Sequence, residues 1–113
     1  MDDQIKLADI KRAVAKKYNL TVAQLISGAR PDYIAHPRQV AMYLAKKLLG
    51  LSYPDLGPPF GGRDHTTVMY GAQRVAWLIG DETFHEPKYK KVERGSDAML
   101  KQEVGELMQS LQA

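Results

Sequence analysis

Residues 60–68 read FGGRDHTTV, in which a glycine pair and an acidic residue precede a polar helix start. Gly61 and Gly62 tolerate the positive φ angles that a tight turn between helices needs, and Asp64 is a favoured N-cap residue. Such a turn before a polar helix start is typical of a helix-turn-helix, but it also fits an ordinary capped helix in an all-helical domain. This stretch alone leaves both interpretations open.

The helix-turn-helix interpretation gives the first residues after the turn a chemical role. In that motif the start of the second helix enters the major groove of DNA. A Thr methyl group can meet a thymine methyl group there, and a hydroxyl or imidazole group can hydrogen-bond base edges. His65, Thr66 and Thr67 are therefore candidate base contacts.

Two upstream motifs distinguish the interpretations. Residues 29–39 read ARPDYIAHPRQ, and the run VAMYLAKKLLG follows directly. With FGGRDHTTV, they resemble the C-terminal DNA-binding domain of the bacterial replication initiators of the DnaA family, over about residues 7–80. Three separated motifs occur in the family's order and spacing, which makes the resemblance specific. The matching positions are Ala35, Pro37, Arg38, Gln39, Ala41, Leu44, Ala45, Lys46 and residues 60–68.

The resemblance implies an all-α fold, a small bundle of about six helices that contains a helix-turn-helix of the DnaA C-terminal or Trp repressor-like kind. It implies sequence-specific binding of double-stranded DNA at sites like the initiator's A·T-rich boxes, in replication initiation or its regulation. No enzymatic activity or cofactor is expected. A transcription regulator, or an interaction module that kept the fold with relaxed DNA specificity, remains an alternative.

The resemblance also implies roles for individual residues. It places major-groove contacts at Asp64, His65, Thr66 and Thr67, although capping alone would explain Asp64. It places Arg30 in the adjacent minor groove, whose narrow A·T-rich form attracts guanidinium groups. Arg38 and Gln39 are expected beside phosphates and bases, and Lys46 at a further backbone contact.

Several positions depart from the family pattern. Asp32 and His36 stand where basic residues are common, which lowers the positive charge beside the DNA. Gly71 replaces the usual Ala of the recognition helix, which removes a methyl contact and costs roughly 1 kcal/mol of helix propensity. Pro58 and Pro59 should shorten the first helix of the helix-turn-helix. These departures predict looser recognition than that of the initiators.

Length and composition exclude several classes of protein. A chain of 113 residues suits one small domain, so an initiator's ATPase module is not expected. Residues 57–64, GPPFGGRD, have the glycine spacing of a phosphate-binding loop, but Arg63 and Asp64 replace its Lys and Ser or Thr, so no nucleotide is expected. No apolar run approaches 18 residues and the start MDDQIK is unlike a signal peptide, which predicts a cytoplasmic protein at the bacterial nucleoid with no membrane partner. With no cysteine and three scattered histidines, no catalytic or metal site is expected.

Charge divides the chain into two parts. Residues 1–80 carry 11 Lys or Arg against 6 Asp or Glu, and residues 81–113 carry 5 against 7. The basic part is expected to be the DNA-binding domain. The acidic part, a polar linker over 81–95 and a C-terminal amphipathic helix, is expected to face away from a duplex or toward a protein partner.

Periodicity and capping residues predict the helices. The expected ranges are 3–17, a short helix over 22–27 capped by Thr21 and closed by Gly28, one from Pro37 to Leu49, a short one over 53–56 capped by Ser52, 65–79 and 96–111. The last helix carries Met99, Leu100, Leu107 and Met108, which suit either burial against the domain's core or a docking face. Glu82, His85 and Glu86 form no chemical motif and fit a solvated linker.

Overall fold

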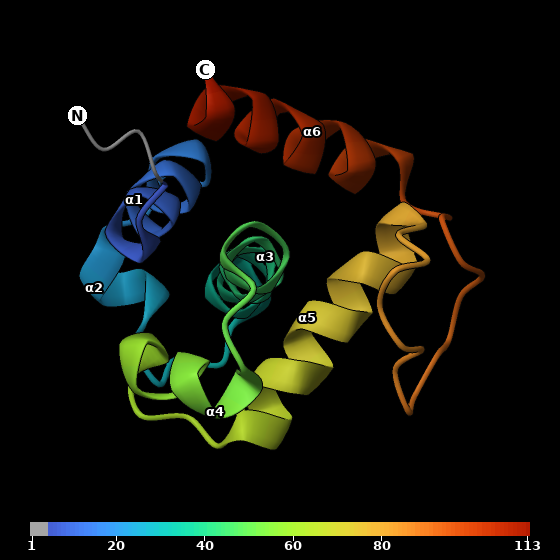
Figure 1. The fold of residues 1–113 in the computed structure, drawn as a ribbon, viewed down its shortest axis with the longest axis horizontal. Helices are drawn as coiled ribbons and strands as arrows, with labels where there is room; N and C mark the ends of the chain where they lie inside the picture. The colour runs from blue at the N-terminus through green and yellow to red at the C-terminus, as the bar shows by residue number, and fades with distance from the viewer. Residues whose placement is uncertain (1–4) are drawn as a thin grey trace.

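The computed structural model describes residues 5–113, and over this range the protein is all-helical (Figure 1). This confirms the predicted fold class. Six α-helices and one 3-10 turn are present in these residues: α1 (Leu7–Lys17), α2 (Val22–Leu25), α3 (Asp32–Leu49), α4 (Tyr53–Leu56), η1 (Pro58–Phe60), α5 (His65–Ile79) and α6 (Ala98–Gln112). The predicted start of the first helix at Asp3 lies outside the described residues. None of the helices described is long and apolar enough to cross a bilayer.

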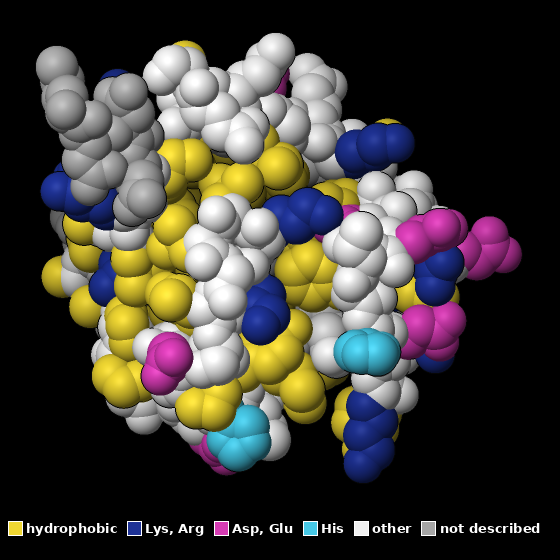
Figure 2. Space-filling view, in the orientation of Figure 1, with side chains coloured by type: hydrophobic (Ala, Val, Ile, Leu, Met, Phe, Trp, Pro, Cys, Tyr) yellow, Lys and Arg dark blue, Asp and Glu magenta, His cyan; other side chains and the backbone are white. Residues whose placement is uncertain are grey.

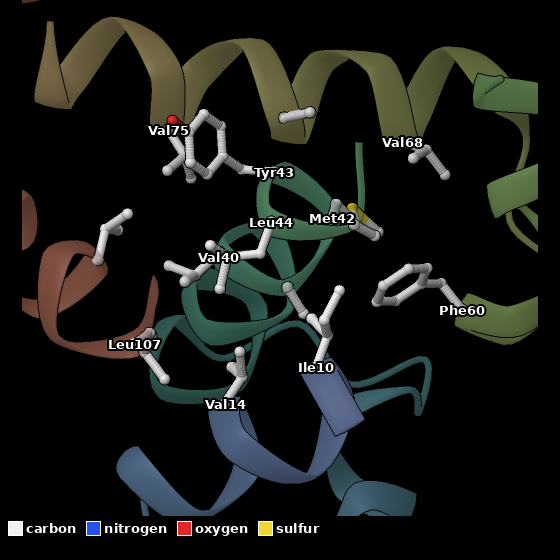
Figure 3. Packing of buried hydrophobic residues seen from close by; sticks show 14 of the residues in the cluster. Ile10, Val14, Val40, Met42, Tyr43, Leu44, Phe60, Val68, Val75 and Leu107 are labelled. Atoms are coloured by element: carbon white, nitrogen blue, oxygen red, sulfur yellow. The ribbon is translucent and has the colours of Figure 1, made fainter. Parts of the chain in front are cut away.

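Helix α3 forms the centre of the bundle, with α1, α5 and α6 arranged around it (Figure 1). Six consecutive α3 residues, 40–45, are buried, so this helix is enclosed on all sides rather than along one stripe. Its side chains meet those of α1 and α5 and the Phe60 ring of η1 in one continuous cluster (Figure 3). The central helix thus fixes where α5 and the turns on either side of it lie.

The start of α3 differs from the prediction. The helix begins at Asp32, because Pro31 is its N-cap residue and the Pro31 carbonyl accepts hydrogen bonds from the amides of Ile34 and Ala35. Pro37 therefore lies in the second turn, where it is buried, and not at the helix start. Helix α2 ends at Leu25, and its C-cap residue is Ile26 rather than Gly28.

The segment from α4 to α5 follows the local sequence chemistry closely. Ser52 and Asp64 cap α4 and α5 as predicted, and Pro58 and Pro59 turn the chain into η1 after a four-residue α4. Gly61 and Gly62 have φ angles of 84° and 73°. A Cβ atom on Gly61 would also clash with the carbonyl oxygen of Ile26, so only glycine fits this turn.

Helix α6 packs across α1 and α5 (Figure 1). Leu100, Val104 and Leu107 are buried in the common cluster, whereas Met99 is 73% exposed. The helix begins at Ala98, later than predicted, because the Asp97 carboxylate accepts the Leu100 amide and is the N-cap. Two of the four residues considered for a docking face are therefore part of the core.

Candidate nucleic-acid interface

The first turn of α5 presents its polar side chains to solvent. Asp64, His65, Thr66 and Thr67 are all exposed. The Asp64 carboxylate accepts the Thr66 amide at 3.2 Å and lies 3.1 Å from Nδ1 of His65. Hydrogen bonding to Thr66, mainly from its backbone amide and then from its side chain, lowers the pKa of Asp64. Asp64 is thus the helix cap, and the three residues after it are free to meet a ligand.

Arg30 lies in the loop between α2 and α3, and it too is exposed. Arg38 of α3 holds this loop through hydrogen bonds to backbone carbonyls. Its guanidinium group donates hydrogen bonds from Nε to the Leu25 carbonyl at 3.0 Å and from Nη2 to the Ala29 carbonyl at 2.7 Å. Arg38 is only 7% exposed. Its pKa is lowered mainly by burial and, to a smaller extent, by the positive charge of Arg63. Its side chain points to loop carbonyls rather than to the outer surface expected of a phosphate ligand.

Arg63 joins the Arg30 loop to the turn before α5. Its guanidinium group donates a hydrogen bond to the Ser27 carbonyl, and Gly61 approaches the neighbouring carbonyl of Ile26. The loop that carries Arg30 and the start of α5 are therefore held at one end of the bundle. The sequence pattern did not predict this role for Arg63. Its position directly after the glycine pair, within FGGRDHTTV, is the one local feature that indicates a structural role in the turn.

Gln39 and Gly71 lie where α3 crosses α5. Oε1 of Gln39 accepts a hydrogen bond from Nη1 of Arg74 at 2.9 Å. A Cβ atom on Gly71 would lie 3.0 Å from both Cγ of Gln39 and Sδ of Met42. Gly71 therefore faces α3, so the methyl group that alanine would add is missing from a helix contact and not from the exposed face of α5. Gln73 of α5 is also buried.

Lys46 lies near the end of α3. Its Nζ donates to the Leu51 carbonyl at 2.9 Å and stands 4.7 Å from the centre of the Tyr53 ring. These contacts hold the connection between α3 and α4, which is the predicted first helix of the helix-turn-helix. His36 is half-buried against Tyr18, and burial together with the Arg74 charge lowers its pKa, so it gains charge only in more acidic solution than an ordinary histidine.

The glycine-rich segment 57–64 is closed on itself, because the amides of Gly62 and Arg63 donate to the Gly57 carbonyl. Across residues 5–113, no group of three His, Asp or Glu side chains has the arrangement of a metal site. Glu82 and Glu86 in the segment after α5 pair with Arg94. Among the described residues, the exposed groups at the start of α5 and Arg30 in the α2–α3 loop form the candidate binding surface.

Comparison with known proteins identifies relatives of this sequence. The sequence family described as "Bacterial dnaA protein helix-turn-helix" matches residues 7–75. The chromosomal replication initiator protein DnaA of Bradyrhizobium sp. (strain BTAi1 / ATCC BAA-1182) is 48% identical over 80 residues, which are 71% of this chain and 17% of that protein. The DnaA protein of Burkholderia vietnamiensis (strain G4 / LMG 22486) is 44% identical over 108 residues, 96% of this chain and 18% of that protein.

The chain therefore spans less than a fifth of the length of these relatives. The second alignment is longer than the resemblance over residues 7–80, and with 108 of 113 residues aligned it includes most of the segment after Gly80.

Proposed function

Because the chain belongs to the family of the bacterial DnaA helix-turn-helix domain, we propose that it binds double-stranded DNA at sites resembling the boxes of the replication initiators. In this proposal, the start of α5 enters the major groove, and Arg30 reaches into the adjacent minor groove. Residues 1–80 carry the sequence reading, and binding requires neither nucleotide nor metal.

One observation carries the proposal: His65, Thr66 and Thr67 are exposed at the start of a capped helix whose preceding turn is bonded to the Arg30 loop. A pre-formed pair of groove-reading elements binds with a smaller entropy loss than two elements that must be ordered on DNA. The Arg63 to Ser27 hydrogen bond supplies that order before DNA arrives.

The geometry refines the roles expected from the sequence. Thr66 and His65 are proposed to read base edges, and Asp64 to orient them as the cap. Arg38 is proposed to act on DNA through the loop that it supports, and Lys46 and Gln39 through the packing of α3 against α4 and α5. Arg30 is proposed to place its exposed guanidinium group in the minor groove, whereas the Arg38 guanidinium group is bonded to backbone carbonyls.

The direct test is a binding titration by fluorescence anisotropy, with a duplex carrying initiator box sites and a scrambled duplex of equal composition. We expect the box duplex to bind more tightly without added ATP, and Arg30→Ala to weaken that preference. Ser110→Ala on α6, an exposed position away from the start of α5, is the control. Equal affinity of the parent chain for both duplexes would refute sequence-specific recognition.

The cellular process is the second part of the proposal. The matched relatives are replication initiators, which favours a role in replication initiation or its regulation. A transcription regulator would use the same surface, so mapping of bound sites on the chromosome distinguishes them: enrichment at origin boxes supports the first role and enrichment at promoters the second. The interaction-module alternative keeps less support, because Leu100 and Leu107 lie in the core.

A further inference from the structure

The segment between α5 and α6 is folded along α5 (Figure 1). The indole Nε1 of Trp77 donates to the Val92 carbonyl at 2.8 Å, and the Gly95 amide donates to the Trp77 carbonyl at 2.8 Å. Lys90 and Arg94 both stand over the Trp77 ring, and Pro87 is buried. The polar segment 81–95 is thus anchored to α5 by these contacts.

Charge is unevenly distributed in this loop. Residues 87–91 read PKYKK and contain three lysines and no acidic residue. Of these three lysines, Lys90 pairs with Glu86; Glu86 also pairs with Arg94, as does Glu82. Among the described residues, neither Lys88 nor Lys91 has a carboxylate within ion-pair distance. Figure 2 shows Lys or Arg side chains at the end of the molecule where this loop turns back.

The tip of the loop lies beside the first turns of α5. A shallow groove between the two is lined by Thr66, Thr67 and Tyr70 on the helix and by Lys88 and Tyr89 on the loop. Tyr89 is 68% exposed, and both Lys88 and Lys91 are exposed. The exposed Lys88 and Tyr89 therefore flank the side chains proposed to read bases, and Lys91 lies further along the same face, in a neighbouring groove with Tyr70 and Arg74.

We propose that residues 87–91 form a second DNA-contacting element, in which Lys88 and Lys91 bind phosphates at the edge of the major groove that α5 enters. This inference rests on the proposed function, and it replaces the expectation that the segment after Gly80 faces away from the duplex. Phosphates that border a groove lie beside any helix inserted into it, so cations next to the start of α5 are placed to reach them. In this arrangement the ring of Tyr89, which lines the groove between the loop and α5, contacts the sugar backbone of the DNA.

The test compares the parent chain with Lys88→Ala/Lys91→Ala and with the control Lys16→Ala/Lys101→Ala. The control removes the same charge from exposed lysines on α1 and α6, away from the start of α5. Affinity for the box and scrambled duplexes is measured from 50 to 300 mM salt. Loss of two phosphate contacts should reduce the slope of log K against log salt by about 1.8 and the affinity at 0.1 M salt by roughly tenfold or more.

We expect the loop variant to weaken both duplexes alike, because phosphate contacts carry no sequence information, while the control keeps the parent's slope. A parent that prefers the box duplex together with a loop variant of unchanged slope would overturn the loop proposal and leave the proposed function standing. An equal loss of slope in both double variants would also overturn it, since the effect would then come from net charge. If the parent binds neither duplex, the proposed function fails and the loop proposal fails with it.

Discussion

The guanidinium group of Arg38 donates a 2.7 Å hydrogen bond to the carbonyl oxygen of Ala29, the residue directly before Arg30. A second bond from the same group reaches the Leu25 carbonyl, so one buried side chain joins the end of α2 to a residue within the α2–α3 loop. The buried Arg38 thus holds the loop that carries the exposed Arg30. Substitutions of the two residues should therefore have different effects.

Arg38→Lys is expected to destabilise the protein, because a lysine ammonium group cannot reproduce two bonds made from Nε and Nη2 of a planar group. We expect a loss of about 2–3 kcal/mol in the free energy of unfolding, measured by urea denaturation, and weaker binding of all duplexes. Arg30→Ala should leave stability within about 0.5 kcal/mol and reduce binding alone. If Arg38→Lys keeps full stability and affinity, Arg38 acts as a simple cation and not as a support for the loop.

Thr66→Ala is expected to change recognition and not folding. Thr66 is exposed, so the free energy of unfolding should change by less than about 0.5 kcal/mol. Loss of one base contact should reduce the preference for the box duplex over the scrambled one by about 1–3 kcal/mol. Thr66→Val keeps a methyl group and removes the hydroxyl group. Its effect in the same titration therefore separates the contribution of the hydroxyl group from that of the methyl group. A box preference unchanged in both variants would remove Thr66 from the reading surface.

Two helical glycines should respond oppositely to alanine. At Gly71 the added methyl group meets Gln39 and the fully buried Met42 at 3.0 Å, so overpacking of about 1–3 kcal/mol should exceed the gain in helix propensity of about 1 kcal/mol. At Gly105 on α6 nothing lies within 4 Å, so Gly105→Ala should stabilise the fold by about 0.5–1 kcal/mol. Thermal unfolding of both variants tests this, and stabilisation by Gly71→Ala would show that the α3–α5 contact has spare room.

The Tyr43 and Asp81 pair should make stability depend on pH. The Tyr43 hydroxyl donates to Asp81 at 2.6 Å, Lys47 lies 3.1 Å from the same carboxylate, and Thr83 donates to it as well. Burial raises the pKa of Asp81, but the hydrogen bonds from Thr83, Tyr43 and Lys47 outweigh it and hold the pKa well below its usual value. The ionised carboxylate therefore stabilises the fold above the unfolded pKa of about 4, and this contribution is lost as the pH falls toward the folded pKa.

Asp81→Asn should cost about 1–3 kcal/mol at pH 7 and flatten the fall in stability below pH 4, measured by urea denaturation across pH. Glu93→Gln, at an exposed position of the same loop, is the matched control and should leave the pH dependence unchanged. Identical pH profiles for the parent and Asp81→Asn would contradict the assignment.

Local chemistry explains why much of the fold is predictable. The bounds of α4 and α5, their caps at Ser52 and Asp64, and the positive φ angles of Gly61 and Gly62 depend on residues within a few positions of each other. The sequence pattern also predicts that His65, Thr66 and Thr67 are exposed, because a helix start that follows its own cap presents its first side chains to solvent.

The sequence by itself determined the family, the helical elements and the polar start of α5, since these depend on short-range spacing. Only the tertiary structure decided that Arg38 and Arg63 hold the Arg30 loop, that Gly71 faces α3, and that residues 87–91 lie beside α5. The physical reason is the same in each case. The atoms that satisfy these side chains belong to distant segments, and no local pattern specifies which carbonyl or helix face they will meet.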